Sequence, residues 1–266
     1  MNPEPLGLPT LTFEDEALLT PGFPPEVVAA VADAFNSAGC VLIERVLDVA
    51  IVDAMHDAFI DRYHRYLDGQ HHDDALEVGP RRIMVTVALE PPFAEPEVYA
   101  NPKLLPILDA LLHEVRLFGF GGVAALPGST EQGVHRDDLG LFHDVVMDGA
   151  VPPYAVSVLI PLVDMRPDTT GTMRVWPGSH REFVSGSEFP FPPVDPLIRR
   201  GSALLMDYRL YHNGTENHSS DSQPILYNVY ARPWYRDVLK YRKQPPLVIS
   251  QDELARVPDE HKGLFA

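Results

Sequence analysis

The sequence predicts a mainly β domain with flanking helices, and three observations support this fold class. Helical patterns of apolar residues come first, within about the first 113 residues. From Val115 onward the chain consists of short apolar runs separated by turns. With 27 prolines and 18 glycines, the chain is also rich in turns, which suits short strands better than a helical bundle. Because no convincing linker interrupts the chain, we expect one domain spanning residues 1–266.

The N-terminal region is expected to begin with an irregular arm. Residues 1–22 are rich in proline and acidic residues and show no clear period. Pro24-Pro25-Glu26 predicts the start of a helix, and Gly39 predicts its end. The apolar run at 40–46 predicts a strand, in which Cys40 is expected to be a buried small hydrophobic residue.

The remainder of the support region, residues 23–113, is predicted to contain two more helices and a strand. Asp48 can cap a helix whose apolar residues recur at three- to four-residue spacing. Residues 68–80 are expected to be a polar loop, and the alternation over 82–89 predicts a strand. Asn101-Pro102 predicts the start of a helix that ends near Leu112.

The strand-rich core is expected to occupy residues 114–240. Its apolar runs are short and separated by turn residues, and no internal repeat, heptad or low-complexity tract occurs. The expected strands fall at residues 115–126, 132–137, 154–163, 172–176, 202–207 and 224–235.

The charge of the chain limits its partners. It carries 38 acidic and 21 basic residues, a formal net charge of −17. This field repels polyanions, so we expect no nucleic-acid partner and a small substrate that is neutral or cationic. No run approaches about 18 consecutive apolar residues, and the N-terminus lacks the features of a signal peptide. We therefore expect no membrane association and a cytoplasmic location.

The motif of greatest chemical interest is His135-Arg136-Asp137. In an extended segment, alternate side chains share a face, so the imidazole of His135 and the carboxylate of Asp137 point the same way. Two ligands do not make a metal site, and His212, which follows a predicted strand and a turn, is the candidate for the third. Two histidines and one carboxylate form the facial triad of non-haem iron(II) oxygenases. His218 is the nearest alternative to His212, and His143 is a less favoured one.

The ordered context of this triad resembles the phytanoyl-CoA dioxygenase-like family. The resemblance consists of His-x-Asp at 135–137, then Thr170-Gly-Thr-Met with Pro177-Gly-Ser-His180, then Tyr211-His-Asn-Gly214 with Asn217-x-Ser219. It extends over about residues 24–236. The resemblance implies a double-stranded β-helix (jelly-roll, cupin-like) core. It also implies an enzyme that uses iron(II), 2-oxoglutarate and O₂ to oxidise a C–H bond of a small metabolite, with decarboxylation of 2-oxoglutarate to succinate.

By this resemblance, His135, Asp137 and His212 are the iron ligands and catalytic residues. Gln132 and Thr172 match positions at which relatives place polar contacts to the cosubstrate. Because Asp137 retains the carboxylate that halogenating relatives lack, we expect hydroxylation or a related oxidation rather than halogenation.

The sequence departs from the family at one position of the cosubstrate site. Relatives usually carry an arginine about eleven residues after the distal histidine, which pairs with the distal carboxylate of 2-oxoglutarate. Here that position is Gln223, which cannot supply the charge. Arg82 and Arg232 are the candidate substitutes. Arg232 lies nine residues beyond Gln223, so a regular strand directs it to the opposite face, which favours Arg82.

Two other functions stay open. Gln223 is compatible with a catalytically silent jelly-roll that binds a metal or ligand without turnover. A cupin-like metal enzyme that does not use 2-oxoglutarate is the other alternative, although cupins usually offer more histidines. Five aromatic residues are candidates for the lining of a substrate pocket, namely Phe142, Tyr154, Tyr208, Tyr211 and Tyr227.

Overall fold

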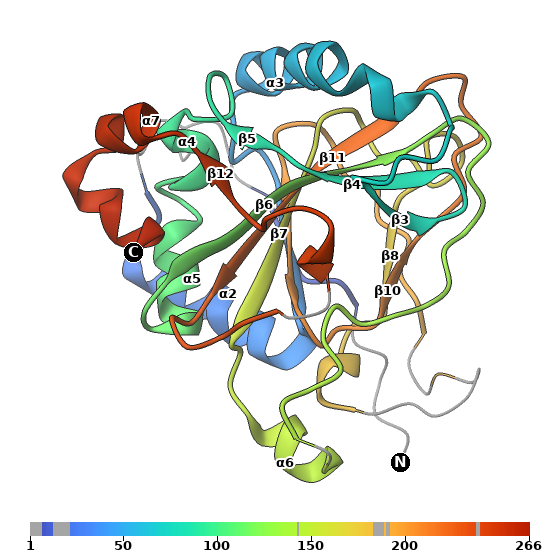
Figure 1. The fold of residues 1–266 in the computed structure, drawn as a ribbon. Coiled ribbons are helices and arrows are strands. Elements are labelled where there is room, and N and C mark those ends of the chain that lie inside the picture. Colours follow the sequence, from blue (N-terminus) through green and yellow to red (C-terminus); the bar gives the residue numbers. More distant parts are fainter. Residues whose placement is uncertain (1–6, 13–21, 143, 183–188, 190–191, 238–239) are drawn as a thin grey trace.

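An eight-stranded sheet is the largest element of the fold (Figure 1). The computed structural model describes residues 7–12, 22–142, 144–182, 189, 192–237 and 240–266. Neighbouring strands of this sheet are antiparallel except for the pair β1–β2, which is parallel. In spatial order the strands are β1 (Thr10–Leu11), β2 (Cys40–Ile43), β9 (Ala203–Asp207), β7 (Ala155–Pro161), β11 (Gln223–Ala231), β6 (Arg116–Ala125), β4 (Arg82–Thr86) and β3 (Leu76–Gly79).

A second, smaller sheet consists of β8 (Met173–Val175) and β10 (His212–Gly214), which pair antiparallel. Isolated bridges add one segment on each side of it, because His135 pairs with His212 and Val175 pairs with Val194. Side chains of the small sheet meet those of the large sheet in the interior. This is the two-sheet arrangement expected of the predicted jelly-roll core.

Most of the helices cover the outer face of the large sheet, whereas the short helix at 145–150 lies apart from it (Figure 1). The first begins with Pro25 in its first turn and ends at Gly39, whose φ of 73° is the left-handed conformation that glycine accepts readily. Asp48 caps the next helix by accepting the N–H of Ala50 at 2.8 Å. Both ends are as predicted. The helices are α2 (Pro25–Ala38), α3 (Val49–Tyr63), α4 (Pro96–Tyr99), α5 (Leu105–Leu112), α6 (Val145–Ala150) and α7 (Gln251–Arg256), with 3-10 helices at His64–Leu67, Ser179–Arg181, Lys240–Arg242 and Asp259–Phe265.

The alternation of side chains along β11 separates two cores. Leu226 and Tyr230 belong to the largest hydrophobic cluster, which also contains residues of α2, α3 and α5. Ile225, Tyr227 and Val229 point the other way and belong to two smaller clusters between the sheets. Because strand side chains alternate, the interior face of every neighbouring strand can be assigned from the register of β11.

Five sequence-based expectations about elements need correction, the first being the strand expected at 132–137, where only the isolated bridge of His135 to His212 forms. The predicted loop at 68–80 ends in β3, and Thr10–Leu11 of the predicted irregular arm pairs with β2. The predicted strand at 82–89 is divided into β4 and β5 (Ala88–Leu89), and β5 pairs instead with β12 (Val248–Ile249). Residues 1–6 and 13–21 of the arm lie outside the described residues.

The helix expected from Pro102 begins only at Leu105. Asn101 Oδ1 accepts the N–H groups of Lys103 and Leu104 at 3.0 and 3.3 Å, which holds a turn before the helix. Short polar side chains compete with helical hydrogen bonds in this way. Cys40 is buried as predicted, and burial raises the pKa of its thiol to about 12.

Candidate metal centre

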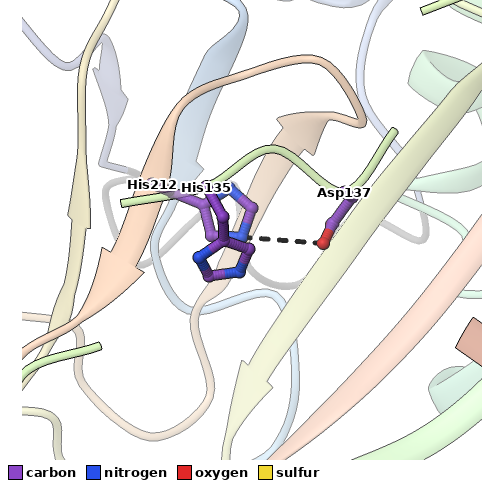
Figure 2. Close-up of side chains that lie close together, drawn as sticks. All are labelled: His135, Asp137 and His212. Carbon is purple, nitrogen blue, oxygen red and sulfur yellow. Dashed lines mark ion pairs between the residues drawn. The ribbon is translucent and has the colours of Figure 1, made fainter. Parts of the chain in front are cut away.

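His135, Asp137 and His212 lie close together in the structure (Figure 2). Each offers one ligand atom, and these atoms all lie within 4.8 Å of one another. His212 Nε2 is 3.7 Å from Asp137 Oδ1, and the two imidazole centroids are 4.5 Å apart. The pairing of His135 with His212 across the small sheet brings residues 77 positions apart in the chain into contact.

Both imidazoles are oriented by backbone carbonyls. His135 Nδ1 is 2.9 Å from the oxygen of Gly133, and His212 Nδ1 is 2.9 Å from the oxygen of Leu210. A carbonyl oxygen only accepts hydrogen bonds, so each Nδ1 carries a hydrogen, and in the neutral imidazole it is then Nε2 that keeps the lone pair. This second hydrogen bond is the usual support of a metal-binding histidine.

The carboxylate of Asp137 is held through both oxygens. Oδ2 accepts hydrogen bonds from Ser157 Oγ, at 3.0 Å, and from the Tyr227 hydroxyl, and Oδ1 accepts one from Lys240 Nζ. Burial raises the pKa of Asp137, but attraction to Lys240 and to the two imidazoles outweighs it and keeps this pKa well below its usual range. Asp137 is therefore ionised at neutral pH.

The donor set suits a divalent metal. Burial lowers the pKa of His212 to about 4, although Asp137 opposes the shift, so His212 is neutral at pH 7 and able to bind a metal. Two neutral imidazole nitrogens and one carboxylate oxygen on one face are a ligand set typical of iron(II). The residues present thus fit the ion that the sequence motif implies.

Arg82 and Gln132 lie beside the backbone that follows His212. Arg82, on β4, is buried, and its guanidinium donates to the carbonyl of Thr215. A methyl group added at Gly214 would lie 2.6 Å from Arg82 Nη1 and 2.7 Å from Gln132 Oε1. The absence of a side chain at Gly214 therefore lets both groups approach the small sheet.

Gln132 and Thr172 make hydrogen bonds that tie segments of the chain together. Gln132 Oε1 accepts the N–H of Gly214 at 2.8 Å, and its amide nitrogen donates to Val78 O. Thr172 is buried, its hydroxyl donates to Pro196 O, and its N–H donates to Thr215 Oγ1 at 2.7 Å.

Gln223 and Arg82 lie at the same level of the large sheet. Gln223 on β11 pairs with Ala125 on β6, and Arg82 on β4 pairs with the same Ala125 from the other side. Residues directly opposite one another share a face, so all three side chains point into the interior. Gln223 Nε2 donates to Gly171 O at 2.7 Å.

Arg232 lies elsewhere. It follows the last residue of β11, and its guanidinium donates to the carbonyls of Pro153, at 2.9 Å, and Leu111, at 3.4 Å. Leu111 belongs to α5, so Arg232 faces the helices. This is the face opposite to that of Gln223, as their odd separation in the chain predicts. The structure does not bring Arg232 to the triad.

His218, the nearest alternative ligand, is not part of this cluster. The side chain of His218 is 61% exposed and pairs with Glu216 at 3.1 Å. His143 lies outside the described residues.

Sequence reasoning missed two contacts of Asp137, those from Ser157 and Lys240. Lys240 is 103 residues away from Asp137 in the chain, and no local pattern connects them. Ser157 carries a weak signal, because it is a single hydroxyl within an apolar strand. Tyr227 was a candidate pocket residue, and its even separation from Gln223 is consistent with its place in the interior.

Comparison with known proteins identifies the family. The model of the family described as phytanoyl-CoA dioxygenase (PhyH) matches residues 35–225, which is most of the chain. The chain therefore belongs to the phytanoyl-CoA dioxygenase family, and the predicted membership is confirmed. The Fe(II)/2-oxoglutarate-dependent dioxygenase nvfF of Aspergillus novofumigatus is 26% identical over 223 residues, covering 76% of this chain and 70% of nvfF.

Solved structures confirm the predicted jelly-roll fold. The non-heme alpha-ketoglutarate-dependent epimerase SnoN from nogalamycin biosynthesis superposes with a TM-score of 0.58 at 18% identity, covering 79% of this chain and 84% of SnoN. HygX from Streptomyces hygroscopicus, solved with nickel and 2-oxoglutarate bound, superposes with a TM-score of 0.55 at 19% identity, covering 80% of this chain and 89% of HygX.

The predicted class of enzyme is also confirmed. The chain is an iron(II)- and 2-oxoglutarate-dependent oxygenase, with O₂ as the second cosubstrate. In the part of the chain that the structure describes, no helix has the length and apolar character that crossing a bilayer requires.

Proposed function

We propose that His135, Asp137 and His212 hold the catalytic iron(II) of this oxygenase. The observation that carries this assignment is the orientation of the two imidazoles. Each Nδ1–H is committed to a backbone carbonyl, so both Nε2 lone pairs remain for a metal beside the ionised Asp137. Bound iron and 2-oxoglutarate would supply the oxidation of a substrate C–H bond, with release of succinate and CO₂.

Arg82 is the residue proposed to bind the distal carboxylate of 2-oxoglutarate. It reaches the interior at the level of Gln223, the position of the missing arginine, and only the small side chain of Ala125 lies between them in the register. Burial lowers the pKa of Arg82 to about 10, which leaves the guanidinium charged at pH 7. Its Nε has no hydrogen-bond partner among the described residues, so the guanidinium retains donor capacity for an anion.

Gln132 and Thr172 are proposed to support this cosubstrate site. Gln132 ties β10 to the carbonyl of Val78, next to Arg82. Thr172 is fixed against Thr215, whose carbonyl accepts from Arg82. Arg232, held by carbonyls near the helices, is not part of the proposal.

The substrate is proposed to be a small neutral or cationic molecule. Support comes from the net charge of −17, which disfavours polyanionic or highly phosphorylated partners at long range. The interior near Asp137 is lined by tyrosines, including Tyr208 and Tyr227, which bind neutral rings and cations alike.

Anaerobic titration of the iron(II)-loaded protein with 2-oxoglutarate tests the proposed function. We expect the weak visible charge-transfer band of the iron–2-oxoglutarate chelate, and its loss in His212→Ala. His218→Ala, which alters an exposed histidine outside the cluster, is the matched control and keeps the band. A band that persists in His212→Ala, or metal binding without a band at millimolar 2-oxoglutarate, would overturn the assignment of these residues to the iron and cosubstrate site.

A further inference from the structure

Lys240 lies against the carboxylate of the proposed metal centre. Its Nζ donates to Asp137 Oδ1 and, at 2.9 Å, to the Tyr227 hydroxyl. The ammonium is 4.6 Å from the ring centroid of Tyr208 and 5.0 Å from that of Tyr227. A carboxylate and two aromatic faces together form a favourable site for a cation.

The atom that Lys240 contacts is also the atom that a metal needs. Asp137 Oδ2 already accepts hydrogen bonds from Ser157 and Tyr227, so Oδ1 is the oxygen that remains. Oδ1 is 3.7 Å from His212 Nε2, a separation that one metal with bonds of about 2.1 Å to each atom can span. An ammonium on the same oxygen would be repelled by that metal, because charges are weakly screened in a buried site.

The segment that carries Lys240 is attached to β4 and β6 of the large sheet. Thr86 Oγ1 donates to Pro245 O at 2.6 Å, and the N–H of Phe120 donates to Pro246 O at 2.9 Å. A methyl group added at Gly119 would lie 2.4 Å from the Tyr241 hydroxyl, so Tyr241 enters the interior beside a position without a side chain. The approach of Lys240 to Asp137 is therefore supported by the contacts of its neighbours.

We propose that Lys240 is a positioning residue that competes with the metal for Asp137 Oδ1. The ammonium holds the carboxylate towards the two histidines and leaves it when a divalent metal binds, so Lys240 lowers the metal affinity of the centre. This inference rests on the proposed metal site. It predicts that a fourth residue lowers the metal affinity of that site, which the three ligands alone do not imply.

Chemical labelling of the lysine amines tests whether the ammonium leaves. Metal-free protein and protein loaded with Zn²⁺, a redox-inert ion that takes the same ligands, are acylated with a small amine-reactive ester and analysed by mass spectrometry. We expect Zn²⁺ to raise the rate of labelling at Lys240. Lys243, an exposed lysine of the same segment, is the internal reference and reacts equally in both samples. In Asp137→Asn, Zn²⁺ should not change the labelling of Lys240.

Metal titration gives a second, independent readout. Lys240→Met keeps most of the apolar stem and removes the competing charge, so we expect it to bind Zn²⁺ roughly tenfold more tightly than the wild type. Lys243→Met removes one positive charge from the same segment without touching Asp137, and its affinity should match the wild type.

The outcomes separate the two proposals. Failure of the wild type to bind Zn²⁺ would overturn the metal centre and this inference with it. Zn²⁺ binding with unchanged labelling of Lys240, or with equal or weaker affinity in Lys240→Met, would overturn the inference and leave the metal centre in place.

Discussion

Arg82 and Gln223 flank the same residue, Ala125, from the two neighbouring strands β4 and β11. Their side chains therefore enter the interior at one level, two strands apart. A cation that β11 lacks can therefore be supplied by β4, because the side chain of Ala125 between the two positions is too small to separate them. This relationship makes the identity of the cosubstrate-binding cation testable.

Exchange of the two side chains should first remove and then restore cosubstrate binding. We expect Arg82→Gln to weaken the binding of 2-oxoglutarate roughly 30-fold or more, since one partner of a charged pair is lost. Adding Gln223→Arg to that variant should recover much of the affinity. The anaerobic charge-transfer titration measures both. Arg232→Gln is the control, and a loss of affinity there with none in Arg82→Gln would contradict the assignment.

The Tyr227 hydroxyl should matter for metal affinity. It donates to Asp137 Oδ2, and outer contacts of this kind are typically worth about 10- to 100-fold in metal affinity. We expect Tyr227→Phe to weaken Zn²⁺ binding within that range, as measured by competition with a chromogenic chelator. Tyr230→Phe is matched in chemistry, but its hydroxyl donates to Tyr99 O on the helix side of β11. Equal losses in both variants would indicate a general effect on the fold.

His180 should contribute to a fall in stability in mild acid. This imidazole is buried beneath Gly39, and burial lowers its pKa from 6.5 to about 4. The unfolded chain binds the proton more tightly than the folded protein does. The contribution of neutral His180 to the unfolding free energy is therefore present above pH 6.5 and is lost as the pH falls towards 4. The full loss amounts to about 3 kcal/mol.

Urea unfolding of metal-free protein at pH 7 and pH 5 measures this effect. We expect His180→Gln to reduce the pH dependence of the unfolding free energy, whatever its effect on stability at pH 7. His113→Gln, at an exposed histidine after α5, should leave the pH dependence unchanged. An unaltered pH dependence in His180→Gln would show that His180 is not the responsible group.

The buried ion pair of Arg209 and Asp207 should be a major determinant of stability. Arg209 Nε and Nη2 donate to the two carboxylate oxygens, each at 2.9 Å, and Nη1 donates to Asp148 O and Val151 O. Both side chains are 1% exposed. Arg209→Met leaves a buried carboxylate unpaired, so we expect a loss of about 3–5 kcal/mol in the unfolding free energy.

An exposed pair provides the comparison for that measurement. Arg166 and Asp164 approach to 3.0 Å near the surface. Arg166→Met should cost less than about 1 kcal/mol, since solvent screens exposed ion pairs. Similar losses in the two variants, measured by urea unfolding, would contradict a special contribution from burial.

The sequence by itself determined the ends of several elements, the family and the candidate metal ligands. Local rules were enough for the ends of α2 and the start of α3, because Gly39 and Asp48 act on their own neighbouring backbone. Two-residue alternation was enough to put His135 and Asp137 on one face. The ordered motifs then indicated His212 and the family.

Only the tertiary structure decided which groups surround that triad. The level at which Arg82 stands opposite Gln223 depends on the register of three strands, and the approach of Lys240 to Asp137 depends on a segment 103 residues away. Such contacts arise from the packing of distant strands. The local propensities and periodicities that a sequence displays depend on near neighbours, so they cannot specify contacts of this kind.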